Sequence, residues 1–323
     1  MSSIEMIRAA HARLSGHVRQ TPILTSPFLD EIAGRRVLVK AECLQHTGSF
    51  KFRGGFSALS GISDAQRAGG VIAYSSGNHA QGVAYAAKLH GVAAVIVMPS
   101  DAPKLKIANT RAFGAEVVLY DRFTEDRDAI GQRIAAERGL TLIKPYDEPL
   151  VIAGQGTLGL ELGPQLAAHG MTSGDVLVCC GGGGLTSGVA LALADVAPGL
   201  RARPVEPEGF DDVGRSLISG KIETNAPNAR SICDAIVTPS PGKVTFPFLQ
   251  KHCGPGLSVT DKDALRAVAQ AFSRLKIVAE PGGAVALAAA LFHPKAVQGE
   301  AVAVVITGGN VDADVFTQAL AQL

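Results

Sequence analysis

The sequence has no tryptophan and few other aromatic residues. It contains 12 Phe and 4 Tyr among 323 residues, which is too few for the aromatic platforms on which proteins stack bases. An excess of charge of one sign is also missing, because 30 Lys and Arg stand against 29 Asp and Glu and the formal net charge is +1. Such a chain has no overall field that attracts nucleic acid or an anionic membrane. We therefore expect a small-molecule ligand and neither of those partners.

Cysteine pairs and long hydrophobic runs are absent as well. The five cysteines form no Cys-x-x-Cys motif, and Cys179 and Cys180 are adjacent in an apolar run, so neither a zinc site nor a disulfide framework is predicted. Residues 1–20 carry charges throughout, and the uncharged run 176–194 is interrupted by four glycines. These segments predict neither a signal peptide nor a membrane span, and we expect a cytoplasmic protein.

Glycine is abundant, with 37 residues, and 47% of the chain is hydrophobic. Short runs rich in Val, Ile, Ala and Leu alternate with segments of helical periodicity, which is typical of α/β folds with parallel strands. The predicted strands cover residues 36–40, 71–75, 93–98, 116–120, 175–180, 202–206 and 301–307. The predicted helices cover residues 78–90, 103–113, 125–138, 184–197, 261–275 and 282–292.

Two polar stretches, at residues 63–69 and 145–149, divide this series of elements. The strands and helices between them form a unit of their own, and a new series of strands begins at Asp175. We therefore predict a small inserted domain of residues 70–146 and a large domain made of residues 1–69 and 147–323.

Four consecutive glycines, Gly181 to Gly184, follow a predicted buried strand and open a helix. Residues without side chains let several N–H groups approach one anion, and the helix N-terminus adds partial positive charge. No lysine follows the run, and its spacing is not that of a dinucleotide fingerprint. The run predicts a phosphate cradle; a tight turn without a ligand is the alternative.

Lys51 lies between Phe50 and Phe52 in a segment flanked by glycines. An amine in apolar surroundings loses part of its preference for a proton and can attack a carbonyl group to form a Schiff base. The alternative is a surface lysine whose stem packs on an aromatic ring.

Polar side chains also follow other predicted strands. Ser75, Ser76, Asn78 and His79 stand between a strand and a helix, the position that ligands occupy in open parallel sheets. They can hold a carboxylate or merely cap the helix. Thr307 ends the last predicted strand in the same topological place, where its hydroxyl can meet a ring nitrogen.

Carboxylates gather after one more strand. Glu206 ends it, and Asp211 and Asp212 follow. Brought together by a loop, such groups can share Mg²⁺ or Ca²⁺. A solvated acidic turn is the alternative.

In this order, the motifs resemble the fold-type II pyridoxal-phosphate enzymes of the serine/threonine dehydratase and serine racemase family over nearly the whole chain. The resemblance implies a fold like that of the tryptophan synthase β subunit, with two open, twisted, mainly parallel sheets flanked by helices. The small domain is expected to close over the substrate. The segments that carry the resemblance are residues 21–22, 49–51, 75–79, 152–157, 181–184, 280–281 and 307–311.

The resemblance also implies a role for each residue of a pyridoxal 5'-phosphate site. Lys51 is expected to hold the cofactor covalently and to take the Cα proton of the substrate, while Phe50 lies against the cofactor ring. Asn78 is expected to bond the ring hydroxyl, and Thr307 the pyridine nitrogen. The other implied cofactor-binding residues are Glu280 and, around the phosphate, Gly181, Gly182, Gly183, Gly184 and Leu185.

The implied substrate is a 3-hydroxy amino acid of the serine, threonine, hydroxyaspartate or phenylserine type. Its carboxylate is expected on Ser75, Asn78 and His79. Because the hydroxyl of Thr307 is neutral, the cofactor is a weaker electron sink, which favours β-elimination to a 2-oxo acid and ammonia over transamination. The alternatives are β-replacement, as in cysteine synthases, and a phosphate-binding module without enzymatic activity.

At two positions the sequence departs from typical bacterial threonine dehydratases. Ser76 stands where those enzymes usually have alanine, as in serine racemases and hydroxyaspartate dehydratases. A serine opposite Lys51 could return a proton to Cα with inversion, so a serine racemase with side dehydratase activity is the alternative function; a helix cap is the alternative role of Ser76. Tyr146 replaces phenylalanine or asparagine and is expected to shape the substrate pocket.

The racemase-like members also imply a metal site and an oligomer. Their glutamate, backbone carbonyl and aspartate ligands fall here on Glu206, Phe210 and Asp212. The resemblance therefore implies a bound Mg²⁺, Mn²⁺ or Ca²⁺, and a homodimer.

Overall fold

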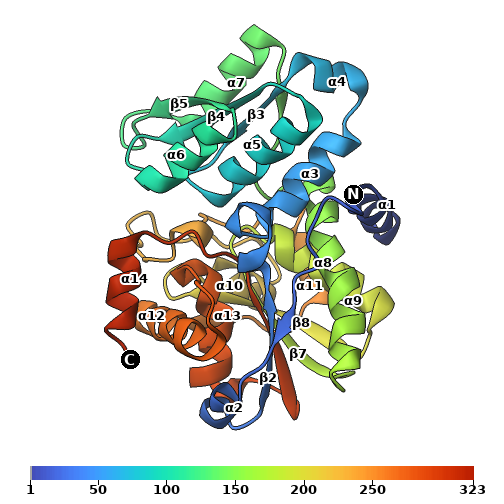
Figure 1. Ribbon diagram of the computed structural model, residues 1–323, viewed down its shortest axis with the longest axis vertical. Helices are drawn as coiled ribbons and strands as arrows, with labels where there is room; N and C mark the ends of the chain where they lie inside the picture. Colours follow the sequence, from blue (N-terminus) through green and yellow to red (C-terminus); the bar gives the residue numbers. More distant parts are fainter. Residues whose placement is uncertain (1) are drawn as a thin grey trace.

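Two mainly parallel sheets organise the computed structural model, which describes residues 2–323 (Figure 1). Among the described strands, only β1 and β2 of the larger sheet pair antiparallel. These sheets confirm the predicted α/β class. The larger sheet has the order β1 (Ile23–Leu24), β2 (Arg36–Ala41), β10 (Ala301–Ile306), β7 (Gly174–Cys179), β8 (Leu200–Pro207), β9 (Leu257–Val259). The smaller sheet has the order β5 (Glu116–Tyr120), β4 (Ala94–Pro99), β3 (Val71–Tyr74), β6 (Thr141–Leu142).

Helices cover both faces of the larger sheet because successive residues of its strands point to opposite sides. In β10, Val304 belongs to a core with α2 (Pro27–Ala33), α12 (Asp261–Gln270) and α13 (Pro281–Phe292). Its neighbour Val305 belongs to the opposite core, with α8 (Pro149–Ala168) and α9 (Gly184–Val196). Both side chains are fully buried, as expected for parallel strands covered on both faces.

The smaller sheet, at the top of Figure 1, is also covered on both faces. On one face Ile96 packs with residues of α3 (Lys51–Gly61), α5 (Asn78–His90) and α6 (Lys104–Ala112). On the other, Val97 packs with Ile134 of α7 (Arg127–Arg138). The strands of this sheet all come from residues 71–142. The predicted domain boundaries at 69/70 and 146/147 stay a prediction, and α3, which precedes them, shares the core of the smaller sheet.

Every predicted strand is present with ends shifted by at most two residues, but several helices were not predicted. The most prominent is α8, which is buried along most of its length and contains Pro164, so it has neither a polar face nor an uninterrupted helical pattern. The predicted helix 261–275 was wrong at its end, because α12 stops at Gln270 and residues Ala271–Leu275 form a π-helix. The other helices that were not predicted are α1 (Ile4–Leu14), α2, α3, α4 (Asp64–Gly69), α10 (Asp212–Ser219), α11 (Phe246–His252) and α14 (Ala313–Leu320).

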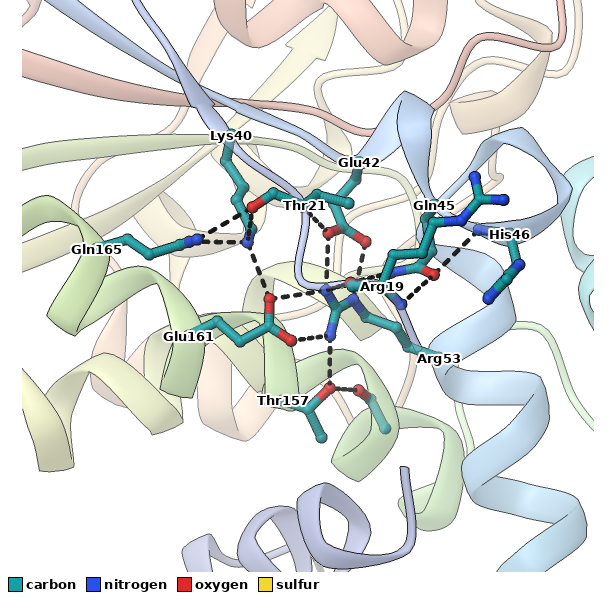
Figure 2. A network of polar contacts seen from close by, with 11 residues as sticks. Arg19, Thr21, Lys40, Glu42, Gln45, His46, Arg53, Thr157, Glu161 and Gln165 are labelled. Atoms are coloured by element: carbon teal, nitrogen blue, oxygen red, sulfur yellow. Dashed lines mark hydrogen bonds and ion pairs between the residues drawn. The ribbon is translucent and has the colours of Figure 1, made fainter. Parts of the chain in front are cut away.

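A buried network of charges fixes the start of α3 (Figure 2). The guanidinium of Arg53 donates to Glu42 at 2.8 Å and to Glu161 of α8 at 2.6 Å, and Lys40 of β2 donates to Glu161 at 2.9 Å. Two positive and two negative side chains thus supply one another's hydrogen-bond partners in the absence of water. A buried ion pair requires such partners, because each charge has lost its hydration. The network holds α3 against the larger sheet two residues beyond Lys51.

Within residues 2–323, the helices are all too short or too polar to cross a lipid bilayer.

Candidate active site

A cavity of about 480 Å³ lies where strands of both sheets end. From the smaller sheet, its lining includes Ser75 after β3, Pro99 at the end of β4 and Tyr120 at the end of β5; Asn310, beyond β10, comes from the larger one. In parallel sheets this edge is where ligands bind. The cavity walls also contain Lys51, Ser76, Asn78, His79, Tyr146 and Glu280, all of which were predicted as site residues.

The amine of Lys51 lies in this cavity. Its Nζ donates a hydrogen bond to the carbonyl oxygen of Pro145 at 2.8 Å and lies 5.2 Å from the ring centroid of Phe50. Burial lowers the pKa of Lys51 to about 8, although the carboxylate of Glu280 opposes the shift. A much larger fraction of this amine is therefore uncharged at neutral pH than of an ordinary lysine, and an uncharged amine is the nucleophilic form.

Ser75 and Ser76, in the segment before α5, have different surroundings. The Oγ of Ser75 accepts a hydrogen bond from the N–H of Gly77 at 3.1 Å. Gly77 is the N-cap residue of α5 and has no side chain to cap it. Ser76, which also lines the cavity, does not occupy the cap position that was its alternative role.

His79 is buried in the first turn of α5 and is neutral. Its Nε2 lies 3.0 Å from the carbonyl oxygen of Ile143, so Nε2 carries the proton and donates. Burial and the nearby Lys51 lower the pKa of His79 to about 3. His79 thus contributes shape and hydrogen bonding to the site, and no positive charge.

Asn78 joins the two sheets through its amide. Its Nδ2 donates to Glu280, and its Oδ1 accepts from Nδ2 of Asn310 at 2.8 Å. Asn310 also donates to the carbonyl oxygen of Thr47 at 2.8 Å. These bonds fix the orientation of the Asn78 amide, so that its second N–H is available to a ligand.

The four glycines form a tight turn between β7 and α9. Gly183 has a φ of +88°, and the carbonyl oxygen of Gly182 accepts a hydrogen bond from Oγ1 of Thr245 at 2.7 Å. Within the described residues, the N–H groups of Gly181 to Gly184 donate no hydrogen bond, as an anion cradle requires. The ring of Tyr146 lies directly on Gly182, where a Cβ would come within 2.3 Å of it, so the glycines do not line the cavity itself.

Three other predicted cofactor residues lie outside the cavity lining. Phe50 donates its N–H to the carbonyl oxygen of Thr307 at 3.0 Å, which joins the segment before Lys51 to the end of β10. Thr307 is buried. Leu185 belongs to the core of the larger sheet with Val189.

The predicted metal ligands Glu206 and Asp212 lie together and are buried. The two Glu206 oxygens accept from the N–H groups of Val213 and Gly214 at 2.9 and 2.8 Å. One Asp212 oxygen accepts from Asn225, and the other, Oδ2, is buried without a hydrogen-bond partner. Burial raises the pKa of Asp212 to about 6. No three His, Cys, Asp or Glu side chains of residues 2–323 form a metal cluster, so a cation here would also need a backbone oxygen.

Comparison with known proteins identifies the family. The model of the family described as pyridoxal-phosphate dependent enzyme matches residues 14–308. The chain belongs to this family. It is 43% identical to an L-threo-3-hydroxyaspartate ammonia-lyase of Pseudomonas sp over 99% of each chain, and 38% identical to a serine racemase of Schizosaccharomyces pombe over 98% of this chain and 96% of the relative. A solved structure of a T.th. threonine deaminase superposes with a TM-score of 0.90 at 44% identity, over 96% of this chain and 99% of that one.

The residues of this family member fit pyridoxal phosphate. Lys51 supplies a buried amine of lowered pKa, and the N–H groups of Gly181 to Gly184 have no acceptor of their own. Next to them, the hydroxyl of Thr186 is buried without a hydrogen-bond partner. A phosphate group satisfies donors of this kind at a helix N-terminus.

Three cations of the cavity, Lys106, Arg122 and Arg127, were missed in the sequence. Lys106 lies near the start of α6, and its Nζ is 3.1 Å from Asp234 and 3.4 Å from Glu280. Arg127 is the first residue of α7. Each follows the carboxyl end of a strand of the smaller sheet, and this position was the signal that could have identified them.

Proposed function

We propose that the chain is an ammonia-lyase that converts a 3-hydroxyaspartate into a 2-oxo dicarboxylic acid and ammonia. The observation that carries the proposal is the guanidinium of Arg127 in the cavity wall. Within residues 2–323, the nearest carboxylate that it meets is Asp128 at 3.9 Å, which leaves its donors open to a ligand. A guanidinium binds a carboxylate through two parallel hydrogen bonds, so a substrate with a second carboxylate fits.

The other cations of the cavity already have partners. Arg122 pairs with Asp101 at 2.7 Å, and Lys106 pairs with Asp234 and Glu280. Arg127 is therefore the cation best placed to distinguish a dicarboxylic amino acid from serine or threonine. The Pseudomonas relative, which is named for 3-hydroxyaspartate, supports the same substrate.

The two carboxylates of such a substrate have separate binding groups. Ser75, Asn78 and the backbone N–H of His79 hold the α-carboxylate at the N-terminus of α5, where the first-turn N–H groups favour an anion. Arg127, at the start of α7, holds the second carboxylate. Because His79 is neutral, the α-carboxylate is bound by hydrogen bonds and the helix dipole, and the positive charge of the site is left to select the β-substituent.

Lys51 moves the proton. Pyridoxal phosphate, when bound, withdraws electrons from the Cα–H bond of the amino acid. The free amine of Lys51 would take the Cα proton, and a pKa of about 8 suits an amine that must gain and lose a proton near neutral pH. Tyr146, which lies on Gly182 and lines the cavity, limits the space for a substrate.

Turnover of single amino acids tests the proposal. We expect the wild-type kcat/KM for L-threo-3-hydroxyaspartate to exceed that for L-serine and L-threonine. Arg127→Gln should lower kcat/KM for the dicarboxylic substrate by roughly 10- to 100-fold, since a hydrogen bond to a charged group contributes about 1.5–3 kcal/mol, and should change the value for serine less than threefold. Arg122→Gln, which removes a paired guanidinium, is the matched control. An equal loss for both substrates in Arg127→Gln would exclude a role in selecting the β-carboxylate.

Ser76 favours a second activity, the racemisation of serine. Ser76 lines the cavity and is not the N-cap of α5, and a hydroxyl there can return a proton to the face of Cα opposite Lys51. We propose racemisation as the alternative function, which a change in optical rotation of L-serine detects.

We also infer a divalent cation held by Glu206, Asp212 and the carbonyl oxygen of Phe210. Support comes from two adjacent buried carboxylates and the unpartnered Oδ2 of Asp212, since an oxygen-seeking cation such as Mg²⁺ would offset their repulsion. Homodimer formation stays a prediction of the family resemblance.

A further inference from the structure

Lys106 is a buried lysine that the reaction described above does not use. Its side chain is 3% exposed, and its Nζ lies 3.4 Å from Oε2 of Glu280, whose side chain is 2% exposed. The two residues come from different sheets, since α6 packs on the smaller sheet and Glu280 precedes α13 on the larger one. A cation and a carboxylate whose side chains are this little exposed interact more strongly than a surface pair.

Glu280 links this ion pair to the reacting groups. Its Oε1 accepts a hydrogen bond from Nδ2 of Asn78, and its negative charge raises the pKa of Lys51 against the effect of burial. Glu280 is therefore the anion that acts on the amine of Lys51, and Lys106 lies on its other side.

Among residues 2–323, Lys106 is the cation with the largest effect on the charge of Glu280. Burial raises the pKa of Glu280, and Lys106 opposes that shift. Asp234 adds a negative charge, and its side chain is 45% exposed. The thiols of Cys43 and Cys179, which Glu280 also influences, are uncharged, because burial raises their pKa values to about 12 and about 11. Lys106 is thus the cation that most strongly favours the charged form of Glu280.

We propose that Lys106 is a positioning residue that keeps Glu280 ionised and bonded to Asn78, and thereby sets the charge beside Lys51. Without Lys106, burial favours the protonated, uncharged form of Glu280. The stabilisation of a positive charge on Lys51 is then lost. This inference rests on one part of the proposed function, the role of Lys51 as the amine that binds the cofactor.

The visible absorption of the bound pyridoxal phosphate, titrated with pH, tests the inference without any substrate. We expect Lys106→Met to move the midpoint of the spectral transition down by about one pH unit, which corresponds to about 1.4 kcal/mol. Glu280→Gln should cause a similar shift. If Lys106 acts through Glu280, adding Lys106→Met to Glu280→Gln should shift the midpoint no further, because the two residues then form one thermodynamic unit.

Two further variants complete the test. Lys104→Met removes an exposed lysine from the same helix and should leave the midpoint unchanged. Lys106→Arg keeps the charge and should restore most of the wild-type midpoint, which a purely structural role for the lysine stem would not predict. An unchanged midpoint in Lys106→Met, or a full shift that persists in the Glu280→Gln background, would overturn the inference. The failure of hydroxyaspartate as a substrate would contradict the proposed function alone, since no substrate is present in the titration.

Discussion

Lys51 Nζ donates to the carbonyl oxygen of Pro145 at 2.8 Å, which joins the first residue of α3 to the segment that leaves the smaller sheet. A neutral carbonyl oxygen orients the amine but supplies no full negative charge to hold it in the ammonium form. Burial therefore lowers the pKa of Lys51 to about 8. One hydrogen bond thus fixes the position of the Lys51 amine, whereas burial by the whole cavity wall lowers its pKa and makes it reactive.

The uptake of pyridoxal phosphate by cofactor-free protein should depend on pH through Lys51. Only the uncharged amine attacks the cofactor carbonyl, so the rate should rise about tenfold per pH unit below 8 and level off above it. Stopped-flow absorbance between pH 6.5 and 9.5 measures this. A rate that still rises at pH 9.5 would mean that the amine titrates like an exposed lysine. Lys51→Ala should show no visible absorption band and no turnover.

Ser76→Ala should separate two activities. Loss of the hydroxyl of this cavity-lining residue should abolish any change of optical rotation with L-serine. Formation of 2-oxo acid from L-amino acids should fall less than about fivefold, because Lys51 still removes the Cα proton. Chiral chromatography and a 2-oxo acid assay measure the two. Ser75→Ala, which removes a hydroxyl that we place on the substrate carboxylate, should instead lower both activities together. Racemisation that survives in Ser76→Ala would assign the second proton transfer to another group.

The stability of the protein should fall with acid partly through His79. Its pKa is about 3 when folded against about 6.5 when unfolded, so the unfolded chain binds more protons between these values. The stabilisation is complete above pH 6.5 and is lost as the pH falls toward 3. Between pH 7.5 and 5.5, wild type should therefore lose roughly 1 kcal/mol more unfolding free energy than His79→Asn, measured by urea denaturation. Equal losses in the two proteins would show that His79 is protonated in the fold.

Arg53→Met should destabilise the protein strongly. It leaves Glu42 and Glu161 with one buried cation, Lys40, and removing one partner of a buried ion pair costs about 3–5 kcal/mol. Arg133→Met, which breaks an exposed pair with Glu137, should cost less than about 1 kcal/mol. Urea denaturation compares the two variants. Losses of similar size would mean that the network of Figure 2 is not what fixes α3.

Removal of divalent cations should lower the melting temperature if Glu206 and Asp212 bind one, because an ion that binds only the folded state stabilises it. Treatment with a chelator followed by Mg²⁺, Mn²⁺ or Ca²⁺ measures the loss and its recovery. Asp212→Asn should abolish the difference. Asp211→Asn should retain it, since Asp211 pairs with Arg215. A melting temperature that no chelator changes would contradict the inferred site.

The parts of the fold that could be predicted are those in which neighbouring residues form a recognisable pattern of apolar and polar side chains. Strands buried on both faces are continuous runs of apolar residues, so β7 and β10 were visible, whereas α8 was not because it is buried along most of its length. Lys51 and Asn78 were found because each stands in a recognisable motif. Lys106 has none, and its partner Glu280 is 174 residues away. Similarly, nothing local indicates that Tyr146 lies on Gly182; such contacts depend on how distant segments pack.

The place of β10 in the larger sheet has a consequence for synthesis. This strand, made of residues 301–306, lies between β2 and β7, so β2 has no parallel neighbour until nearly the whole chain has left the ribosome. The strands of the smaller sheet are complete at residue 142. A growing chain can therefore assemble the smaller sheet first, since domains fold as units during translation, and must hold β2 and β7 apart until β10 arrives. The catalytic pocket, which needs residues from both sheets, is among the last parts of the protein to form.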